Sequence, residues 1–149
     1  MSPRGSRVWP SGLCWCGGRE GRPPMKLPST PSSLQVVRLE VQRRAMDAGM
    51  AESDADMLVA AAHEAVTNAI EHGNRGDASL QVTVDISVDR GRIAVRVTDE
   101  GEGFPPMDGQ EDRISERGRG LRLMRALVDE VRIEQGRGEI TLIKGIRAS

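Results

Sequence analysis

Residues 80–99 carry the pattern that most restricts how this chain can fold. From Leu80 to Val88 apolar and polar side chains alternate without a break, and after the turn at residues 89–91 large apolar residues recur at every second position, Ile93, Val95 and Val97, up to Asp99. A period of two residues is typical of strands with one buried face, and the short glycine-containing turn predicts a hairpin. Asp99 continues the apolar row of the second strand, where a carboxylate is costly unless donors meet it. We therefore predict that Asp99 is either paired inside the fold or faces a ligand.

Two helices are predicted before this hairpin, over residues 34–48 and 54–72. Apolar residues at helical spacing define one face of each helix, and a capping box formed by Ser53 and Asp56 opens the second helix. The predicted apolar positions are Val36, Val37, Val41 and either Ala45 or Met46 in the first helix, and Met57, Leu58, Ala61, Ala62, Ala65, Val66 and Ala69 in the second. Each helix therefore has one face to bury against another layer.

The remaining segments complete one domain over residues 25–149. Residues 25–27 are predicted to form a short edge strand, a helix starts at Gly120 or Leu121, and a final hairpin joins residues 131–135 to 139–144. Strands joined as hairpins and preceded by helices predict an α+β two-layer sandwich, with a mixed, mostly antiparallel sheet covered on one face by helices. Residues 101–117 have no apolar period, and a loop of this length is usually functional or disordered.

Residues 1–24 are predicted to form a disordered N-terminal extension, with Met25 as an alternative start. The segment has no helical or strand period and lacks the apolar stretch of a signal peptide. Cys14 and Cys16 are the only cysteines of the chain, and no histidine lies nearby. Because a zinc site needs about four ligands, we predict two reduced thiols and a cytoplasmic protein.

Composition excludes two classes of partner. The net charge is -1, the pI is about 6.1 and aromatic residues make up 2 % of the chain, so neither a basic surface nor base-stacking platforms are expected. No apolar run approaches the roughly 20 residues that cross a bilayer. We therefore predict no direct contact with nucleic acid and none with a membrane.

Three polar residues fall in line on the second predicted helix. Glu64, Asn68 and His72 follow one another at intervals of four residues, along the edge of the apolar stripe. A carboxamide oxygen suits a magnesium ion that keeps most of its waters, and a nearby carboxylate can serve as a general base. Asp99, at the end of a strand, can accept a hydrogen bond from an exocyclic amine of a base.

Glycines then supply close backbone approaches to a ligand. Gly101 and Gly103 follow Asp99, and Gly118 and Gly120 precede a predicted helix, whose free amides make a seat for phosphate. Arg117 and Arg119 add cationic donors. Each of these residues taken alone is more simply explained as a surface residue of a helix or a turn. The chain also lacks the G-x-G-x-x-G motif and the lysine of a P-loop, so the glycines alone do not identify a nucleotide site. Their order and spacing together predict a pocket for a magnesium–nucleotide complex.

Three segments of the chain resemble a known family. They are residues 63–73 (HEAVTNAIEHG), 98–104 (TDEGEGF) and 117–121 (RGRGL). They resemble the nucleotide-binding fold of gyrase-type ATPases, sensor histidine kinases and mismatch-repair ATPases, and within that group the bacterial anti-sigma factor serine kinases. The resemblance extends over about residues 25–147. Relatives tend to carry a threonine after the final hairpin turn, where this chain has Gly138 and Glu139.

The resemblance implies roles for the motif residues. Glu64 would activate the target serine, Asn68 would coordinate Mg²⁺, and Asp99 would contact the adenine amine of ATP. Gly101 and Gly103 would shape the adenine pocket, and residues 118–120 would border the phosphates as part of a mobile lid. The implied cofactor-binding residues are Asn68, His72, Asp99, Gly101, Gly103, Arg117, Gly118, Arg119, Gly120 and Leu121.

The resemblance also implies partners. Such proteins hold a sigma factor away from RNA polymerase, phosphorylate a serine of a small anti-anti-sigma protein, and are usually homodimers. Two alternatives stay open from the residues alone. The chain could be a non-catalytic, ATP-dependent partner-binding module, or a detached catalytic domain of a histidine kinase.

Overall fold

The computed structural model of this chain describes residues 7–8, 14–15, 23–101, 116–134 and 138–146. Its helices are α1 (Ser32–Asp47), α2 (Glu52–Asn68), the π-helix η1 (Ala69–Gly73) and α4 (Glu116–Leu127). Its strands are β1 (Arg7–Val8), β2 (Cys14–Trp15), β3 (Met25–Pro28), β4 (Gln81–Asp89), β5 (Arg92–Thr98), β6 (Glu130–Glu134) and β7 (Glu139–Gly145). This order of elements matches the predicted one from residue 25 onward.

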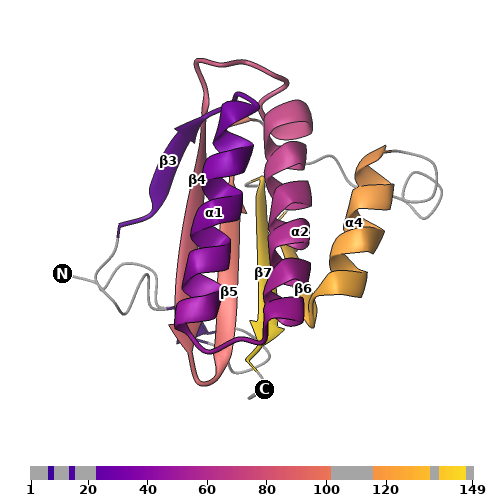
Figure 1. Ribbon diagram of the computed structural model, residues 1–149. Coiled ribbons are helices and arrows are strands. Elements are labelled where there is room, and N and C mark those ends of the chain that lie inside the picture. The colour runs from indigo at the N-terminus through magenta and orange to yellow at the C-terminus, as the bar shows by residue number, and fades with distance from the viewer. Residues whose placement is uncertain (1–6, 9–13, 16–22, 102–115, 135–137, 147–149) are drawn as a thin grey trace.

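Five of these strands form one antiparallel sheet in the order β3-β4-β5-β7-β6. Strand β7 lies between β5 and β6, although both of those strands precede it in the chain. Helices α1 and α2 lie side by side across one face of the sheet, and α4 flanks α2 (Figure 1). The predicted α+β two-layer sandwich is therefore confirmed.

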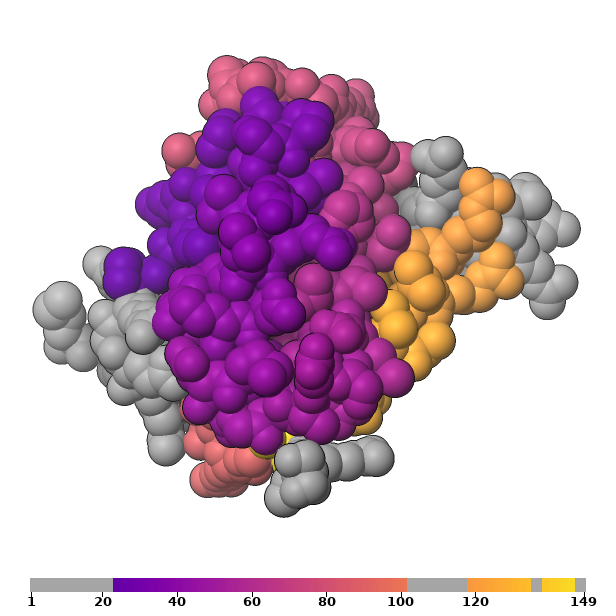
Figure 2. Space-filling view, in the orientation of Figure 1, coloured from indigo at the N-terminus to yellow at the C-terminus, as the bar shows by residue number. Residues whose placement is uncertain are grey.

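The core fills the space between the two layers. The apolar row of each central strand faces the helices, as the period of two predicts. Figure 2 shows α1 and α2 side by side on one face of the molecule, with no gap between them. The core includes Val37, Val41, Ala45, Leu58, Ala62, Val66, Val82, Val84, Val95, Val97, Met124 and Leu142.

Two of the predicted core residues lie instead on the surface. Val36 of α1 is 45 % exposed, and Met57 of α2 is 41 % exposed. Of the two alternatives Ala45 and Met46, Ala45 is buried and Met46 is exposed. Val37, Val41 and Ala45 recur every four residues and fix the buried line of α1. Because successive residues are about 100° apart around a helix, Val36 is turned away from that line. The apolar face is thus narrower than the sequence predicted.

The starts of α1 and α2 also differ from the prediction. Helix α1 begins two residues earlier, at Ser32, and the Ser33 hydroxyl donates to the Pro28 carbonyl oxygen at 2.7 Å. Helix α2 begins at Glu52 after Ala51, with no side-chain capping bond, so the predicted capping box is wrong. Acidic residues in the first turn favour this end electrostatically.

The last turn of the second predicted helix is a π-helix. The Asn74 N–H donates to the Ala69 carbonyl oxygen, five residues back, at 2.8 Å. The α-helical prediction for residues 69–72 is therefore wrong, because the chain widens at η1 before the turn to β4. Such wide turns are frequent at functional sites.

The β4–β5 hairpin agrees closely with its prediction. The strands pair from Thr83–Thr98 to Asp89–Arg92. The two residues of the turn, Arg90 and Gly91, have φ angles of 54° and 73°. Positive φ at both positions is the requirement of a type I′ turn, which matches the twist of the flanking strands.

Helix α4 begins at Glu116, four residues before the predicted start at Gly120. The prediction placed Gly118 before the helix, whose free amides were expected to seat phosphate, yet Gly118 and Gly120 are both buried within α4. A methyl group on Gly120 would lie 3.0 Å from Glu64 Oε2 of α2. Gly120 therefore lies directly against the end of the Glu64 side chain of α2.

Two predicted segments can be compared with the structure only in part. Residues 102–115 of the predicted loop, including Gly103, lie outside the described residues. In the predicted extension, the described residues are 23 and 24 and those of β1 and β2, which pair with each other. Among the helices that the structure describes, none is both long and apolar enough to span a bilayer.

Candidate functional site

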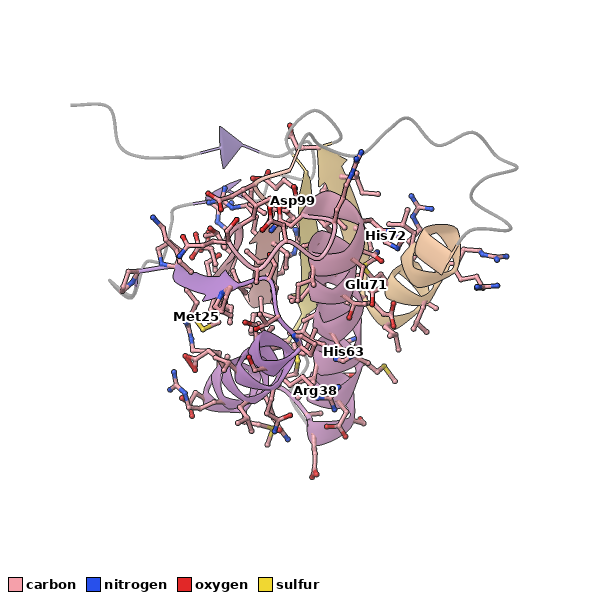
Figure 3. All side chains as sticks on the ribbon, turned by 90° about the horizontal axis from the view of Figure 1, so that it is seen from above. Met25, Arg38, His63, Glu71, His72 and Asp99 are labelled. Atoms are coloured by element: carbon pink, nitrogen blue, oxygen red, sulfur yellow. The ribbon has the colours of Figure 1, made fainter. Side chains whose placement is uncertain are left out.

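A cavity of about 320 Å³ lies between α2 and α4. It is lined by Glu64, Thr67, Asn68, Glu71 and His72 from α2 and η1, and by Arg119, Gly120 and Leu123 from α4. Figure 3 shows Glu71 and His72 on the side of α2 that faces α4. Five of the predicted site residues thus line one cavity. A second cavity, of about 340 Å³, lies between α1 and strands β3 and β4 and contains none of them.

Asn68 is the most deeply buried polar residue of this cavity. Its side chain is 3 % exposed, and its Nδ2 atom has no hydrogen-bond partner among the described residues. An unsatisfied buried amide costs about 1–3 kcal/mol, so the site is built to meet a further group. Glu64, one turn earlier, lies at the edge of the same cavity and is half-buried.

Gly120 faces both of these side chains. A methyl group at this position would lie 3.4 Å from Asn68 Nδ2, in addition to its close approach to Glu64. The absence of a side chain on α4 therefore keeps room beside the carboxylate and the carboxamide. A ligand atom in this space can reach both the Glu64 carboxylate and the Asn68 carboxamide.

Asp99 lies against Gly73, the last residue of η1, and is enclosed by three glycines. We call Gly73, Gly101 and Gly138 the glycine cradle. A methyl group on Gly73 would lie 2.0 Å from Asp99 Oδ2, and one on Gly138 would lie 2.4 Å from Asp99 Oδ1. Asp99 is 5 % exposed, and its Oδ1 accepts the Gly101 N–H at 2.9 Å. The prediction that Asp99 continues the buried row is confirmed.

The register of the sheet explains the place of Gly138. The Asp99 N–H donates to the Gly138 carbonyl oxygen at 3.0 Å, which extends the β5–β7 ladder by one residue. Thr141 pairs with Arg96 and therefore lies on the opposite face of the sheet from Asp99. The threonine that relatives tend to carry after this turn is thus not supplied by Thr141, and a glycine faces Asp99 instead.

Other predicted site residues lie elsewhere. Asp99 and Gly101 do not line the cavity between α2 and α4, although η1 connects the two places. Leu121 is 3 % exposed and belongs to the core. Gly118 is buried in the first turn of α4, and nothing is described of the Arg117 side chain.

The sequence prediction missed three residues of the cavity: Thr67, Glu71 and Leu123. Thr67 lies one residue before Asn68, and its hydroxyl is buried without a partner among the described residues. Glu71 follows Glu64 by seven residues, or about two helical turns. The seven-residue spacing from Glu64 places Glu71 on the same side of the helix, and it was the sequence signal that could have identified Glu71. Leu123 carried no sequence signal, and it is 44 % exposed.

The donor set around the cavity limits the metals that can bind there. Among the described residues, no group of three or more His, Cys, Asp or Glu side chains converges as a metal site requires. A cation at Asn68 would take most of its ligands from water and from a bound phosphate. This arrangement suits Mg²⁺, which keeps several waters and binds through few protein oxygens. The residues present therefore fit a magnesium–phosphate complex.

Replacing Gly73 by alanine is expected to destabilise the fold by about 1–3 kcal/mol, because the new methyl group overlaps the Asp99 carboxylate. The free energy of unfolding in urea would measure this loss. Gly120→Ala is the matched control, since its nearest contact is the flexible end of Glu64 and alanine favours a helix by about 1 kcal/mol. Equal destabilisation by both substitutions would contradict the described packing of Gly73 on Asp99.

Comparisons with known proteins agree with this geometry. A family model described as a histidine kinase-like ATPase domain matches residues 27–144, so the predicted extension lies outside the match. The chain is similar to the serine-protein kinase RsbW of Bacillus licheniformis, with 34 % identity over 74 % of this chain and 76 % of the relative. It is also similar to RsbW of Bacillus subtilis, with 33 % identity over 76 % of this chain and 78 % of the relative.

Solved structures give the same fold. The RsbU and RsbW domains of a Mycobacterium tuberculosis protein match with a TM-score of 0.59 and 29 % identity, over 85 % of this chain. The chain spans about a third of that longer structure, 34 % of its length. The histidine kinase domain of an Erythrobacter litoralis blue-light-activated kinase matches with a TM-score of 0.52 and 18 % identity, over 80 % of this chain and 61 % of that one.

Proposed function

The chain belongs to the histidine kinase-like ATPase domain family, and on that premise we propose that it is an ATP-dependent serine-protein kinase and an anti-sigma factor. It binds a sigma factor and phosphorylates a serine of a small anti-anti-sigma protein. One observation carries this proposal: the Glu64 carboxylate and the Asn68 carboxamide lie beside Gly120 in one cavity. The likeness to the RsbW kinases over most of the chain supports it.

The nucleotide would extend along η1 from one end of the site to the other. Asp99 would accept a hydrogen bond from the adenine amine, with the glycine cradle against the base. The phosphates would lie between α2 and α4, where Arg119 and Gly120 line the cavity. Asn68 would hold Mg²⁺, which neutralises phosphate charge when bound.

Transfer needs little covalent chemistry from the protein. Glu64 accepts the proton of the target serine, the serine oxygen forms a bond to the γ-phosphorus, and the bond from that phosphorus to the bridging oxygen of ADP breaks. Positioning and charge stabilisation supply most of the rate in such reactions. The half-buried place of Glu64 at the cavity edge lets a protein hydroxyl reach it.

The regulatory role sets further expectations. A protein that holds a sigma factor away from RNA polymerase acts in the cytoplasm, and it contacts protein rather than DNA. We further propose a homodimer of the domain over residues 25–149. Sedimentation of the purified protein would measure that state.

Labelled ATP tests the proposal. The full chain is incubated with γ-labelled ATP and with partner proteins captured from native cells. We expect acid-stable label on a serine of a small partner. Bound ATP without transfer would favour a partner-binding module, and acid-labile label on a histidine would favour a detached histidine kinase domain.

Asn68→Ala is expected to weaken the binding of ATP roughly tenfold or more when Mg²⁺ is present, and to leave binding in EDTA unchanged. The reason is that the carboxamide contacts the cation and not the nucleotide itself. Calorimetric titrations with and without Mg²⁺ separate the two conditions. An equal loss in both would contradict the proposed role of Asn68.

A further inference from the structure

Asn74 is a buried polar residue that the catalytic proposal does not use. It follows Gly73 directly and is 2 % exposed. Its Oδ1 accepts the Glu100 N–H at 2.9 Å, and its Nδ2 donates to Ser29 Oγ at 2.7 Å and to the Gln81 carbonyl oxygen at 3.0 Å. Each polar atom of this side chain therefore has a partner on another segment of the chain.

These bonds fix the two segments that meet at Asp99. Asn74 is the neighbour of Gly73, which packs on the Asp99 carboxylate, and Glu100 is the neighbour of Asp99 itself. The bond from the Glu100 N–H to Asn74 Oδ1 therefore ties η1 to the end of β5, one residue beyond the contact of Gly73 with Asp99. Glu100 is held a second time, because its carboxylate accepts the Gln81 N–H.

The far side of Asn74 is also anchored. Ser29, which accepts from Asn74 Nδ2, donates its own hydroxyl to the Leu80 carbonyl oxygen at 2.8 Å. Leu80 and Gln81 lead into β4. The Asn74 side chain is held by one donor, the Glu100 N–H, and by two acceptors, Ser29 Oγ and the Gln81 carbonyl oxygen. An amide with these partners has a single orientation, so Oδ1 is presented to Glu100 in a fixed direction.

We propose that Asn74 is the positioning residue that fixes Asp99 and thereby sets the preference of the site for adenine over guanine. The inference rests on the proposed function, in which Asp99 receives the base. Adenine carries an amine donor where guanine carries a carbonyl acceptor. A rigid carboxylate accepts a hydrogen bond from the adenine amine and repels the guanine carbonyl oxygen. Sites that pair a buried polar group with its ligand discriminate strongly against a ligand that lacks the matching group.

Asn74→Ala tests this inference. Without Oδ1 the Glu100 N–H loses its acceptor and Asp99 is no longer fixed in direction. We expect the dissociation constant of Mg-ATP to rise about tenfold and that of Mg-GTP to change little. The ratio of the Mg-GTP constant to the Mg-ATP constant, which measures the preference for adenine, therefore falls about tenfold. Calorimetry on the full chain measures both constants, and circular dichroism checks folding.

Two further variants separate positioning from general stability. Ser29→Ala removes a partner of Asn74 but leaves the bond to Glu100, so it should lower stability and keep the wild-type ratio. Asn74→Asp loses the two bonds that Nδ2 donates and should lower stability, but it keeps an acceptor for the Glu100 N–H and should retain the ratio even if Asn74→Ala does not fold. A wild-type ratio in folded Asn74→Ala, an equal loss in Ser29→Ala, or a lost ratio in Asn74→Asp would each overturn the inference. Absence of ATP binding by the wild-type chain would instead refute the proposed function.

Discussion

Glu64→Gln is expected to lower the rate of phosphoryl transfer to the partner serine by about 10²–10⁴-fold, the usual contribution of a general base. The amide keeps the shape of the side chain but cannot accept the serine proton. ATP affinity should stay near that of the wild type, because on the proposed function Glu64 would meet the acceptor hydroxyl and not the base. Labelled-ATP transfer measures the first quantity and calorimetry the second.

Glu71→Gln is the matched control for this prediction. Glu71 lines the same cavity and is on the same side of the helix as Glu64, but it is exposed. Its removal should change transfer only slightly. If Glu71→Gln slowed transfer as much as Glu64→Gln, or if Glu64→Gln abolished ATP binding, the assignment of Glu64 as the base would be wrong.

Asp99→Asn should weaken ATP binding by about a hundredfold, the upper range for a buried hydrogen bond to a charged group. The Gly101 N–H donates to Oδ1 of this side chain, so the oxygen of an asparagine would be held there. The amide nitrogen would then occupy the position of Oδ2 and present a donor to the adenine amine. Two facing donors cannot form a hydrogen bond, and the contact becomes repulsive.

Asp85→Asn provides the comparison for Asp99→Asn. Asp85 is likewise a buried carboxylate of the same sheet, but it lies on the opposite face and pairs with Arg96 at 3.3 Å. Its substitution should lower stability and leave ATP affinity unchanged. Calorimetry on both folded variants distinguishes them, and similar affinity losses would show that Asp99 acts through the fold and not through the base.

Local periodicity predicted the parts of the fold that depend on it. The β4–β5 hairpin followed from the period of two and its turn residues, and the order of elements followed from the apolar patterns. Glu64, Asn68 and His72 were found together because residues four apart share one side of a helix. These signals lie within a few residues of one another along the chain.

Features set by distant contacts could not be predicted in the same way. Asn74 has partners 26 and 45 residues away, and no period in the sequence connects them. The close approaches of Gly73 to Asp99 and of Gly120 to Glu64 likewise join elements that are far apart in the sequence. A glycine in a sequence signals freedom of the backbone, but only the fold shows which side chain fills the space.

The position of β7 in the sheet has a consequence for the newly made chain. A ribosome releases the helices and strands β3, β4 and β5 first, yet Gly138, which encloses Asp99, arrives with β7. Until residues 138–145 have emerged and inserted between β5 and β6, the side of Asp99 that Gly138 covers stays open to water. On the proposed function, a molecule still under synthesis can neither hold ATP nor phosphorylate its partner, so nucleotide occupancy marks a finished domain.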